Sequence, residues 1–470
     1  MKRMTAILIP LLFATLVVAC GPAEDARVTA TSVSPTSLRP LPSATPSSLP
    51  SSPPPSQTPT AKPTATWVPT VTPRPSALPA TPPSELLATM DTIASQMADL
   101  RGLSLSVPIT RTVMTRQELG AYLDAEFAKE YTPEEMEQDV LVLSAFDFVE
   151  PGYDLRQVLL DLYSEEILGL YDNELNTFYI ISDGEFSLLD QLTVAHEYVH
   201  ALQDENLGLD TFTDEEQLSD DELLARMALV EGDATLAMTD YLQARRSELS
   251  ADDWASLLAE SATAGDQGLD DVPPIIRETF DFPYVYGLEF VTLLQEEGWP
   301  AVDAAFVDPP QSTEQVLHPE KYLSRDEPQL LALPPLTDTL GTGWRLLEAE
   351  TLGEFQTGLY LVQEVDQETA DRASKGWDGD QYAVYAREGT TVLAFATVWD
   401  SPADREEFVA AYQQYATQKY GQLPTRSTGT ESWWEAPSET TVLTWEGDTA
   451  LVVAGPDSDT VYRLLLATKP

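Results

Sequence analysis

The chain has 470 residues, and its 77 Asp and Glu residues against 26 Lys and Arg residues give a formal net charge of −51. Such an acidic chain is repelled by nucleic acid and by anionic lipid headgroups, so composition argues against both as partners. The single cysteine excludes a disulfide within the chain.

Residues 1–20 have the pattern of an export signal. Lys2 and Arg3 give a basic start, and the apolar run that follows is too short for a comfortable membrane span. The run ends in Val-Val-Ala before Cys20, which looks like a bacterial lipoprotein signal with Cys20 as the lipidated first residue. The alternatives are an ordinary signal-peptide cysteine and an uncleaved anchor helix. We expect an exported protein that is attached to the bacterial membrane through lipidated Cys20 and faces outward.

Residues 21–83 are rich in Pro, Ser, Thr and Ala and have almost no large apolar side chains. A segment of this composition cannot bury enough surface to offset its ordering entropy, and its proline runs favour extended polyproline II. We expect a disordered stalk here. The rest of the chain exceeds one typical domain, and a proline-rich boundary near residues 328–336 predicts two, over residues 84–335 and 336–470.

The start of the first domain is predicted to be helical. Thr115 with Glu118, and Thr132 with Glu135, match the capping box at the start of a helix. The expected elements are helices near 84–103, 115–130, 133–148 and 154–166, with a short strand within 107–114. Residues 166–182 favour a β-hairpin that turns at Asp-Asn-Glu. It is either an ordinary structural hairpin or an edge strand that binds a peptide backbone.

The stretch HEYVH, residues 196–200, holds two of only three histidines in the chain. On a helix, His196 and His200 stand on one face about 6 Å apart, close enough for both to bind one tetrahedral zinc. Glu197 is one step round the helix, where it can reach a water on the open zinc position as a general base. The alternative is an amphipathic helix whose histidines bind no metal.

A long helix is predicted over residues 222–246, and Glu231 lies on its apolar face. A carboxylate on such a face is costly unless it is paired or bound to metal. Glu231 is therefore the expected third zinc ligand, and a buried pair with Arg226 is the alternative. Asp233 is a candidate for the layer behind the ligands.

Asp204 lies on the histidine face of the first helix, but it is eight residues, or about 12 Å, from His196. That distance is too long for Asp204 and His196 to share one zinc. Asp204 is expected to be at most an orienting partner of His200, or a polar residue at the helix end.

The segments HEYVHALQD, ALVEGDATLAM and STEQVLHPEKY together resemble a family of bacterial HEXXH zinc metallopeptidases of the gluzincin type. The likeness spans roughly residues 160–330. It implies a mainly helical zincin-like fold, a peptide or protein substrate, His196, His200 and Glu231 as Zn²⁺ ligands, and Glu197 as the catalytic glutamate. Gluzincins of the thermolysin type carry an aspartate four residues after the glutamate ligand, where this chain has Thr235. The role of that aspartate then falls to Asp233 or Asp204, or is absent.

Two further positions are candidates for binding a developing oxyanion. His318, in STEQVLHPEKY, is one, and the alternative is a histidine that caps a turn or helix. Tyr284 or Tyr286 is the other, within residues 283–298, which are apolar and aromatic at their start and helical afterwards. A buried structural tyrosine is the alternative for both.

The second domain is predicted to be a smaller α+β unit with an antiparallel sheet. Expected strands are residues 358–365, 380–387, 390–399, 439–445 and 449–455, with helices over 401–420 and 457–468. No catalytic constellation occurs in it.

The fold class expected for the whole is α+β, and the expected function is a surface-tethered, zinc-dependent peptidase. The alternative is a non-catalytic stalked surface lipoprotein for adhesion or ligand binding, with a structural or vestigial zinc site. A third possibility, a chance HEYVH in a helical scaffold, predicts no zinc. Substrate and oligomeric state do not follow from the sequence.

Overall fold

The computed structural model describes residues 83–468, apart from residues 173–174, 182–185, 214–216 and 265–271. The predicted signal with Cys20 and the predicted stalk lie outside the described residues. All the described residues fall in one compact unit. None of their helices combines the length and the apolar character that a membrane span needs.

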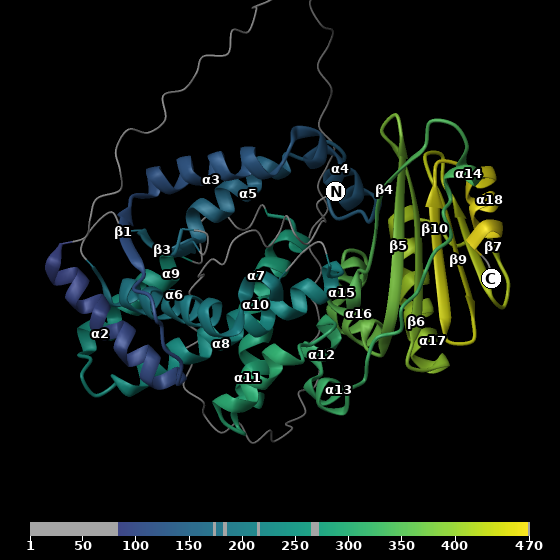
Figure 1. The fold of residues 1–470 in the computed structure, drawn as a ribbon. Coiled ribbons are helices and arrows are strands. Elements are labelled where there is room, and N and C mark those ends of the chain that lie inside the picture. The colour runs from purple at the N-terminus through teal and green to yellow at the C-terminus, as the bar shows by residue number, and fades with distance from the viewer. Residues whose placement is uncertain (1–82, 173–174, 182–185, 214–216, 265–271, 469–470) are drawn as a thin grey trace, which may run out of the picture. The chain divides into compact units, whose positions relative to one another are not determined.

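The first part of the described chain is mainly helical (Figure 1). Its helices are α2 (Ser84–Arg101), α3 (Arg116–Glu130), α4 (Pro133–Ala145), α5 (Leu155–Glu166), α6 (Leu188–Leu207), α7 (Leu209–Phe212), α8 (Asp220–Ala244), α9 (Ala251–Ala264), α10 (Pro274–Gln295), α11 (Trp299–Val307), α12 (Thr313–Leu317) and α13 (Pro319–Ser324). The capping boxes predicted at Thr115 and Thr132 are both formed. Because each satisfies two backbone donors that a helix start leaves unpaired, they fix where α3 and α4 begin.

A three-stranded sheet of β1 (Thr110–Met114), β2 (Gly169–Asp172) and β3 (Thr177–Ile181) has the order β1-β3-β2. The predicted hairpin is confirmed, because β2 and β3 pair antiparallel, and β1 adds in parallel on the other side of β3. Strand β2 packs closely on α6. A Cβ atom on Gly169 would lie 2.5 Å from a methyl carbon of Thr193 and 3.2 Å from Cγ of Glu197.

Helices α8 and α10 cross in very close contact at two glycines. A Cβ on Gly232 would lie 2.2 Å from the carbonyl oxygen of Gly287, and a Cβ on Gly287 would lie 2.1 Å from that of Ala228. No real side chain tolerates such distances, so the backbones approach only because both positions lack one. This contact fixes α8, and with it Glu231, against the aromatic helix α10.

The second part is an α+β region, drawn in green to yellow in Figure 1. Its strands are β4 (Arg345–Glu350), β5 (Trp377–Arg387), β6 (Thr390–Trp399), β7 (Arg426–Ser427), β8 (Glu431–Glu435), β9 (Thr440–Glu446) and β10 (Thr449–Gly455). Its helices are α14 (Thr337–Leu340), α15 (Gly353–Val362), α16 (Gln367–Ser374), α17 (Pro402–Tyr420) and α18 (Ser458–Thr468). The sheet is antiparallel, with the order β4-β5-β6-β10-β9-β8-β7. The expected fold class, a mainly helical part followed by an α+β part, is thus confirmed.

Two expectations about elements were wrong. Residues 358–365 were expected to form a strand, but most of them belong to α15. The spacing of their apolar residues also suits a helix. Phe355, Leu359 and Val362 are three or four residues apart, and Tyr360 and Leu361 are buried. Helix α10 begins at Pro274, well before residue 283, and passes through Pro283. An interior proline normally ends a helix, but Phe282 and Tyr284 beside it are buried, and this packing supports the helical path.

The two parts share one hydrophobic core. Phe146, at the end of α4, makes edge-to-face contacts with Tyr360, Tyr382 and Phe395, at centroid distances of 5.3, 5.1 and 5.9 Å. Such aromatic contacts add about 0.5–1.5 kcal/mol each to the burial of apolar area. The α+β part is therefore packed against the helical part, and the predicted domain boundary near residue 335 stays a prediction.

We predict that Gly232→Ala lowers the thermal midpoint of unfolding, because the new methyl group must separate α8 from α10. Overpacking of this kind costs about 1–3 kcal/mol. The matched control is Gly429→Ala, since a Cβ there meets no atom within 4 Å. Equal midpoints for the two variants in a thermal melt would contradict the close crossing.

A second prediction concerns Asp139, on α4, whose pKa is raised to about 8 by burial and by Glu348 and Glu135. An exposed aspartate titrates near 3.8. Between pH 4 and pH 8 the folded state keeps a proton on Asp139 that the unfolded state loses. The free energy of unfolding therefore falls as the pH rises from 4 to 8, and below pH 4 this group does not lower it. Asp139→Asn should therefore raise the melting temperature at pH 8 more than at pH 5. Parallel melting-temperature profiles for wild type and variant would contradict it.

Candidate metal centre

Helix α6 brings the two histidines of HEYVH together as the i,i+4 spacing predicts. Ser187 and Asp190 form a reciprocal capping box at its start, and Gly208 ends it in the left-handed conformation. The rings of His196 and His200 lie edge to face with centroids 4.6 Å apart. Their Nε2 atoms are 2.9 Å apart and face the same point.

Helix α8 supplies Glu231 to that point. Its Oε2 lies 3.1 Å from Nε2 of His196 and 3.3 Å from Nε2 of His200. The three side chains are buried, with 1% or less of each exposed. Within the part of the chain that the structure describes, these three residues are the one group of His, Cys, Asp or Glu whose ligand atoms converge closely enough to hold a metal ion.

The three ligand atoms fit a zinc ion. A triangle with sides of 2.9, 3.1 and 3.3 Å has a circumscribed radius of about 1.8 Å. Zinc binds His nitrogen and carboxylate oxygen at about 2.0–2.2 Å, so the three atoms are spaced closely enough to hold one ion. Three protein ligands would leave one position of a tetrahedral ion open.

Electrostatics at the site favour a cation beside the carboxylate. Burial lowers the pKa of His196. Burial acts on His200 in the same direction, but Glu231 and Glu197 outweigh it and raise the pKa of His200 to about 9. Burial would raise the pKa of Glu231, yet the two histidines bring it down to about 2. Glu231 is thus an anion that needs a positive partner, which a divalent ion supplies.

Gln203 orients His200 from behind. Its Nε2 donates to the carbonyl of Val230 and to Oδ2 of Asp233, both at 2.9 Å. Because both partners are acceptors only, Oε1 of Gln203 must face His200, whose Nδ1 is 2.8 Å away and donates to it. With Nδ1 held as the donor, a metal that displaces the proton on Nε2 would meet the lone pair of that atom, which points at Glu231.

Arg101, at the end of α2, fixes Asp233 in turn. Its guanidinium binds Asp233 through Nε at 2.6 Å and through a second nitrogen at 3.2 Å. It also binds Asp303 at 2.5 Å and lies over the ring of Trp299. The side chains of Arg101 and Asp233 are fully buried. A hydrogen-bonded series therefore connects α2 to His200 through Asp233 and Gln203.

Glu197 is buried on the side of α6 that faces the small sheet, where the absent side chain of Gly169 makes room for it. A cavity of about 230 Å³ reaches Glu197 from the direction of α2 and β1. The ring centroid of Tyr284, on α10, lies 6.4 Å from that of His196. Asp204 accepts a hydrogen bond from the hydroxyl of Tyr171, on β2, at 3.0 Å. The hydrogen bond from Nδ1 of His200 goes to Gln203, and not to Asp204.

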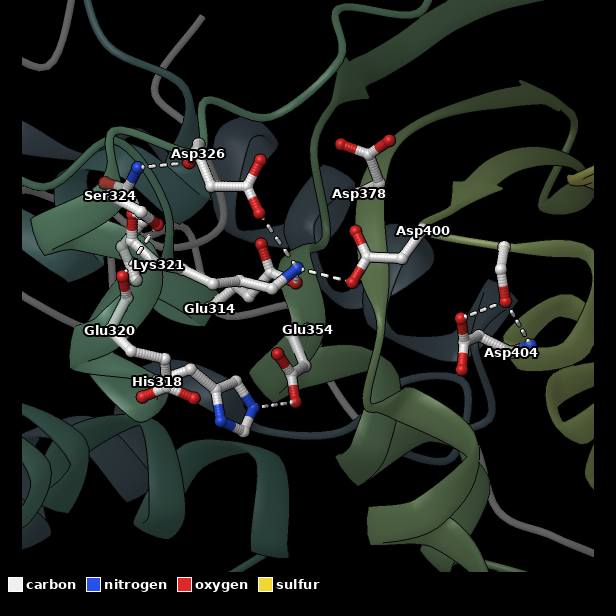
Figure 2. A network of polar contacts seen from close by, with 12 residues as sticks. Glu314, His318, Glu320, Lys321, Ser324, Asp326, Glu354, Asp378, Asp400 and Asp404 are labelled. Atoms are coloured by element: carbon white, nitrogen blue, oxygen red, sulfur yellow. Dashed lines mark hydrogen bonds and ion pairs between the residues drawn. The ribbon is translucent and has the colours of Figure 1, made fainter.

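His318 belongs to a different cluster, shown in Figure 2. It lies between α12 and α13, and its Nε2 is 2.9 Å from Oε1 of Glu354, on α15. Nearby Lys321 binds Glu314 and Asp400, at 2.6 Å each. None of the contacts described for His318 involves the three candidate ligands.

Asp233 was a candidate for the layer behind the ligands, but sequence reasoning missed its neighbours Gln203 and Arg101. Gln203 is three residues after His200, on the same helix face, so its spacing was a usable signal. Arg101 is 132 residues from Asp233, and no local pattern connects them. Tyr171 was recognised only as part of a strand.

Comparison with known proteins gives one partial match. The model of a domain of unknown function, DUF8575, matches residues 344–465. No curated protein and no solved structure matches the chain. The matched segment covers most of the α+β part and none of the metal-centre residues. The structure thus defines a protein with a candidate His-His-Glu metal centre, and the function must be argued from that centre.

We predict that Gln203→Leu weakens zinc binding about 10–100-fold, the usual cost of losing a group that orients a ligand. The variant removes the acceptor for Nδ1 of His200 but leaves all three ligand atoms in place. Competition with a chromophoric chelator measures the affinity. Gln117→Leu, on the exposed surface of α3, is the matched control. Unchanged affinity in Gln203→Leu would contradict the orienting role.

Proposed function

We propose that this protein is a zinc-dependent peptidase. The observation that carries the proposal is the convergence of His196, His200 and Glu231, with Glu197 between the two histidines on the same helix. Two imidazoles and one carboxylate are the ligand set of catalytic zinc sites that keep a position open. The resemblance of three sequence segments to HEXXH metallopeptidases supports the same reading.

A zinc ion bound there would act as a Lewis acid toward a peptide carbonyl and would acidify the attacking water. Glu197 takes a proton from that water and passes it to the leaving amine, a task that suits a buried carboxylate one helical step from the ligands. His200 keeps its Nε2 lone pair toward the centre because Gln203 holds the proton of Nδ1. Burial of all four side chains strengthens the electrostatic interactions among them.

For the oxyanion of the tetrahedral intermediate we assign Tyr284 ahead of His318. The Tyr284 ring lies beside the ring of His196, whereas the described contacts of His318 are in another cluster. A phenol hydroxyl near the centre can donate a hydrogen bond to negative charge as it develops.

The second candidate is a structural metal site in a non-catalytic surface protein. A structural zinc site normally has four protein ligands. Among the described residues the group has three members, which favours the catalytic reading. The export signal, Cys20 and the Pro- and Ser-rich segment, read from sequence, support placing the activity on a lipid anchor outside the cell.

We predict that Glu197→Gln keeps one zinc per chain but lowers peptide hydrolysis at least about 100-fold, because the amide cannot take the proton. Glu231→Ala should lose zinc and activity together. Elemental analysis gives the zinc content, and hydrolysis of denatured casein gives the activity.

The matched control is Glu222→Gln, which removes a carboxylate from the same helix as Glu231, where it pairs with Arg226 near the surface. It should keep both zinc and activity. Full hydrolysis by zinc-loaded Glu197→Gln would refute the mechanism. Zinc binding without hydrolysis by the wild type would leave the structural site as the better reading.

A further inference from the structure

A cavity of about 790 Å³ lies between the helical part and the α+β part. Helix α10 and the end of α12 form one wall, and α15 and α16 form the other. Its volume is in the range of about 300–1,000 Å³ that is typical of ligand sites. The residues that line it are distinct from those of the metal centre.

The His318–Glu354 pair is the built feature of this cavity (Figure 2). Glu354 is 4% exposed, so the carboxylate has a fixed position, and it accepts a hydrogen bond from Nε2 of His318. In the neutral imidazole, donation from Nε2 to Glu354 leaves the lone pair of Nδ1 for a ligand. No hydrogen bond to this Nδ1 occurs among the described residues. The pair therefore presents an oriented acceptor at the cavity wall.

The other polar residues that line the cavity are mixed in kind: the carboxylates Glu278 and Asp371, the cations Arg277 and Lys375, and the neutral side chains of Gln367 and Ser374. Glu278, on α10, and Asp371, on α16, contribute carboxylates from opposite walls. Each already has one partner beside it on the chain, Arg277 or Gln367, and each carboxylate can accept further hydrogen bonds. The two carboxylates therefore keep acceptor capacity that a ligand with N–H donors can fill.

The remaining lining is apolar and aromatic. Phe355 and Tyr286 face one another across the two walls, with ring centroids 6.0 Å apart, and Leu359 follows one turn later on α15. All three are half-buried. Two cations also line the walls: Arg277, which pairs with Glu278, and Lys375, which forms no ion pair within the described part of the chain.

We propose that this cavity binds a stretch of polypeptide in which a basic side chain stands next to an apolar one. Backbone N–H groups and a basic side chain supply the donors that Nδ1 of His318, Glu278 and Asp371 lack, and the apolar side chain covers Phe355 and Leu359. The net charge of −51 attracts such a chain from a distance. Its use as a second contact for substrate, away from the metal centre, rests on the proposed peptidase function.

The test measures binding in full-length, zinc-loaded protein that carries Glu197→Gln, so that no hydrolysis is needed. The probes are fluorescein-labelled octapeptides of alternating Leu and Lys, or of alternating Leu and Glu, followed by fluorescence polarisation. The Leu–Lys peptide should bind at least about tenfold more tightly, and added salt should weaken it. His318→Ala and Leu359→Arg should each weaken it about fivefold or more, and Lys375→Glu should tighten it.

Matched controls separate the cavity from general effects of charge and folding. Lys129→Glu makes the same charge change as Lys375→Glu on the exposed surface of α3, and Leu423→Arg puts the arginine on an exposed loop. Neither should change affinity, and thermal melts confirm that each variant is folded. Equal binding of both peptides, or equal effects of Lys129→Glu and Lys375→Glu, would overturn the proposal. If spermidine displaced the Leu–Lys peptide and bound as tightly as the peptide does, the ligand would be a free polyamine and the assignment to polypeptide would be overturned.

The link to peptidase activity is tested separately, in zinc-loaded protein that keeps Glu197. Leu359→Arg should raise KM about fivefold or more for a long Lys-rich polypeptide and leave kcat/KM for a tripeptide unchanged. An equal loss on both substrates would overturn the role as a second substrate contact. If the wild type hydrolyses neither substrate while the Glu197→Gln protein binds as described, the peptidase proposal fails and the cavity proposal stands.

Discussion

The burial of the Glu231 carboxylate is the constraint on which the metal centre depends. Its side chain is 1% exposed on the apolar face of α8, where an unpaired charge costs several kcal/mol. Two imidazoles from α6 face it, and they can be neutral ligands of a divalent ion or share a proton. Either way the region is stable only if positive charge sits among the three side chains. Holding α6 and α8 at this separation is therefore a requirement of the fold as well as of the chemistry.

Two kinds of contact hold that separation, and they differ in how they resist change. The Gly232–Gly287 crossing fixes α8 through contact between backbones, and such a contact cannot adjust by a change of side-chain rotamer. The series from Arg101 through Asp233 and Gln203 fixes the ring of His200 through charged, fully buried groups. Loss of Arg101 or Asp233 would leave a buried charge without its partner, and loss of Gln203 would leave Nδ1 of His200 without its acceptor, so this series behaves as a unit. Helix α2 is thus part of the metal centre, although it carries no ligand.

How far the sequence predicted this site depends on the range of each interaction. The ligand pair in α6 and the capped starts of α3 and α4 follow from spacings of three or four residues, and the structure has them as expected. Glu231 followed from a polar residue in an apolar helical stripe. The placement of His318 did not follow, because its partner Glu354 comes from another helix in the α+β part. The strand expected over residues 358–365 was wrong for a related reason. The apolar residues of this segment fit both the period of a strand and that of a helix, and only the packing around the segment decides between the two.

The α+β part buries Phe146 of the helical part, and it also contributes residues to the large cavity. It supplies Glu354, which fixes the imidazole of His318, and it forms one complete wall of the large cavity. A wall built from two regions can bind a ligand only while those regions stay in contact, so the shared aromatic core is a condition for this cavity. The metal centre depends on this contact less directly, because its three candidate ligands lie on α6 and α8, within the helical part. Damage to the contact between the two parts should therefore affect the cavity before it affects the metal.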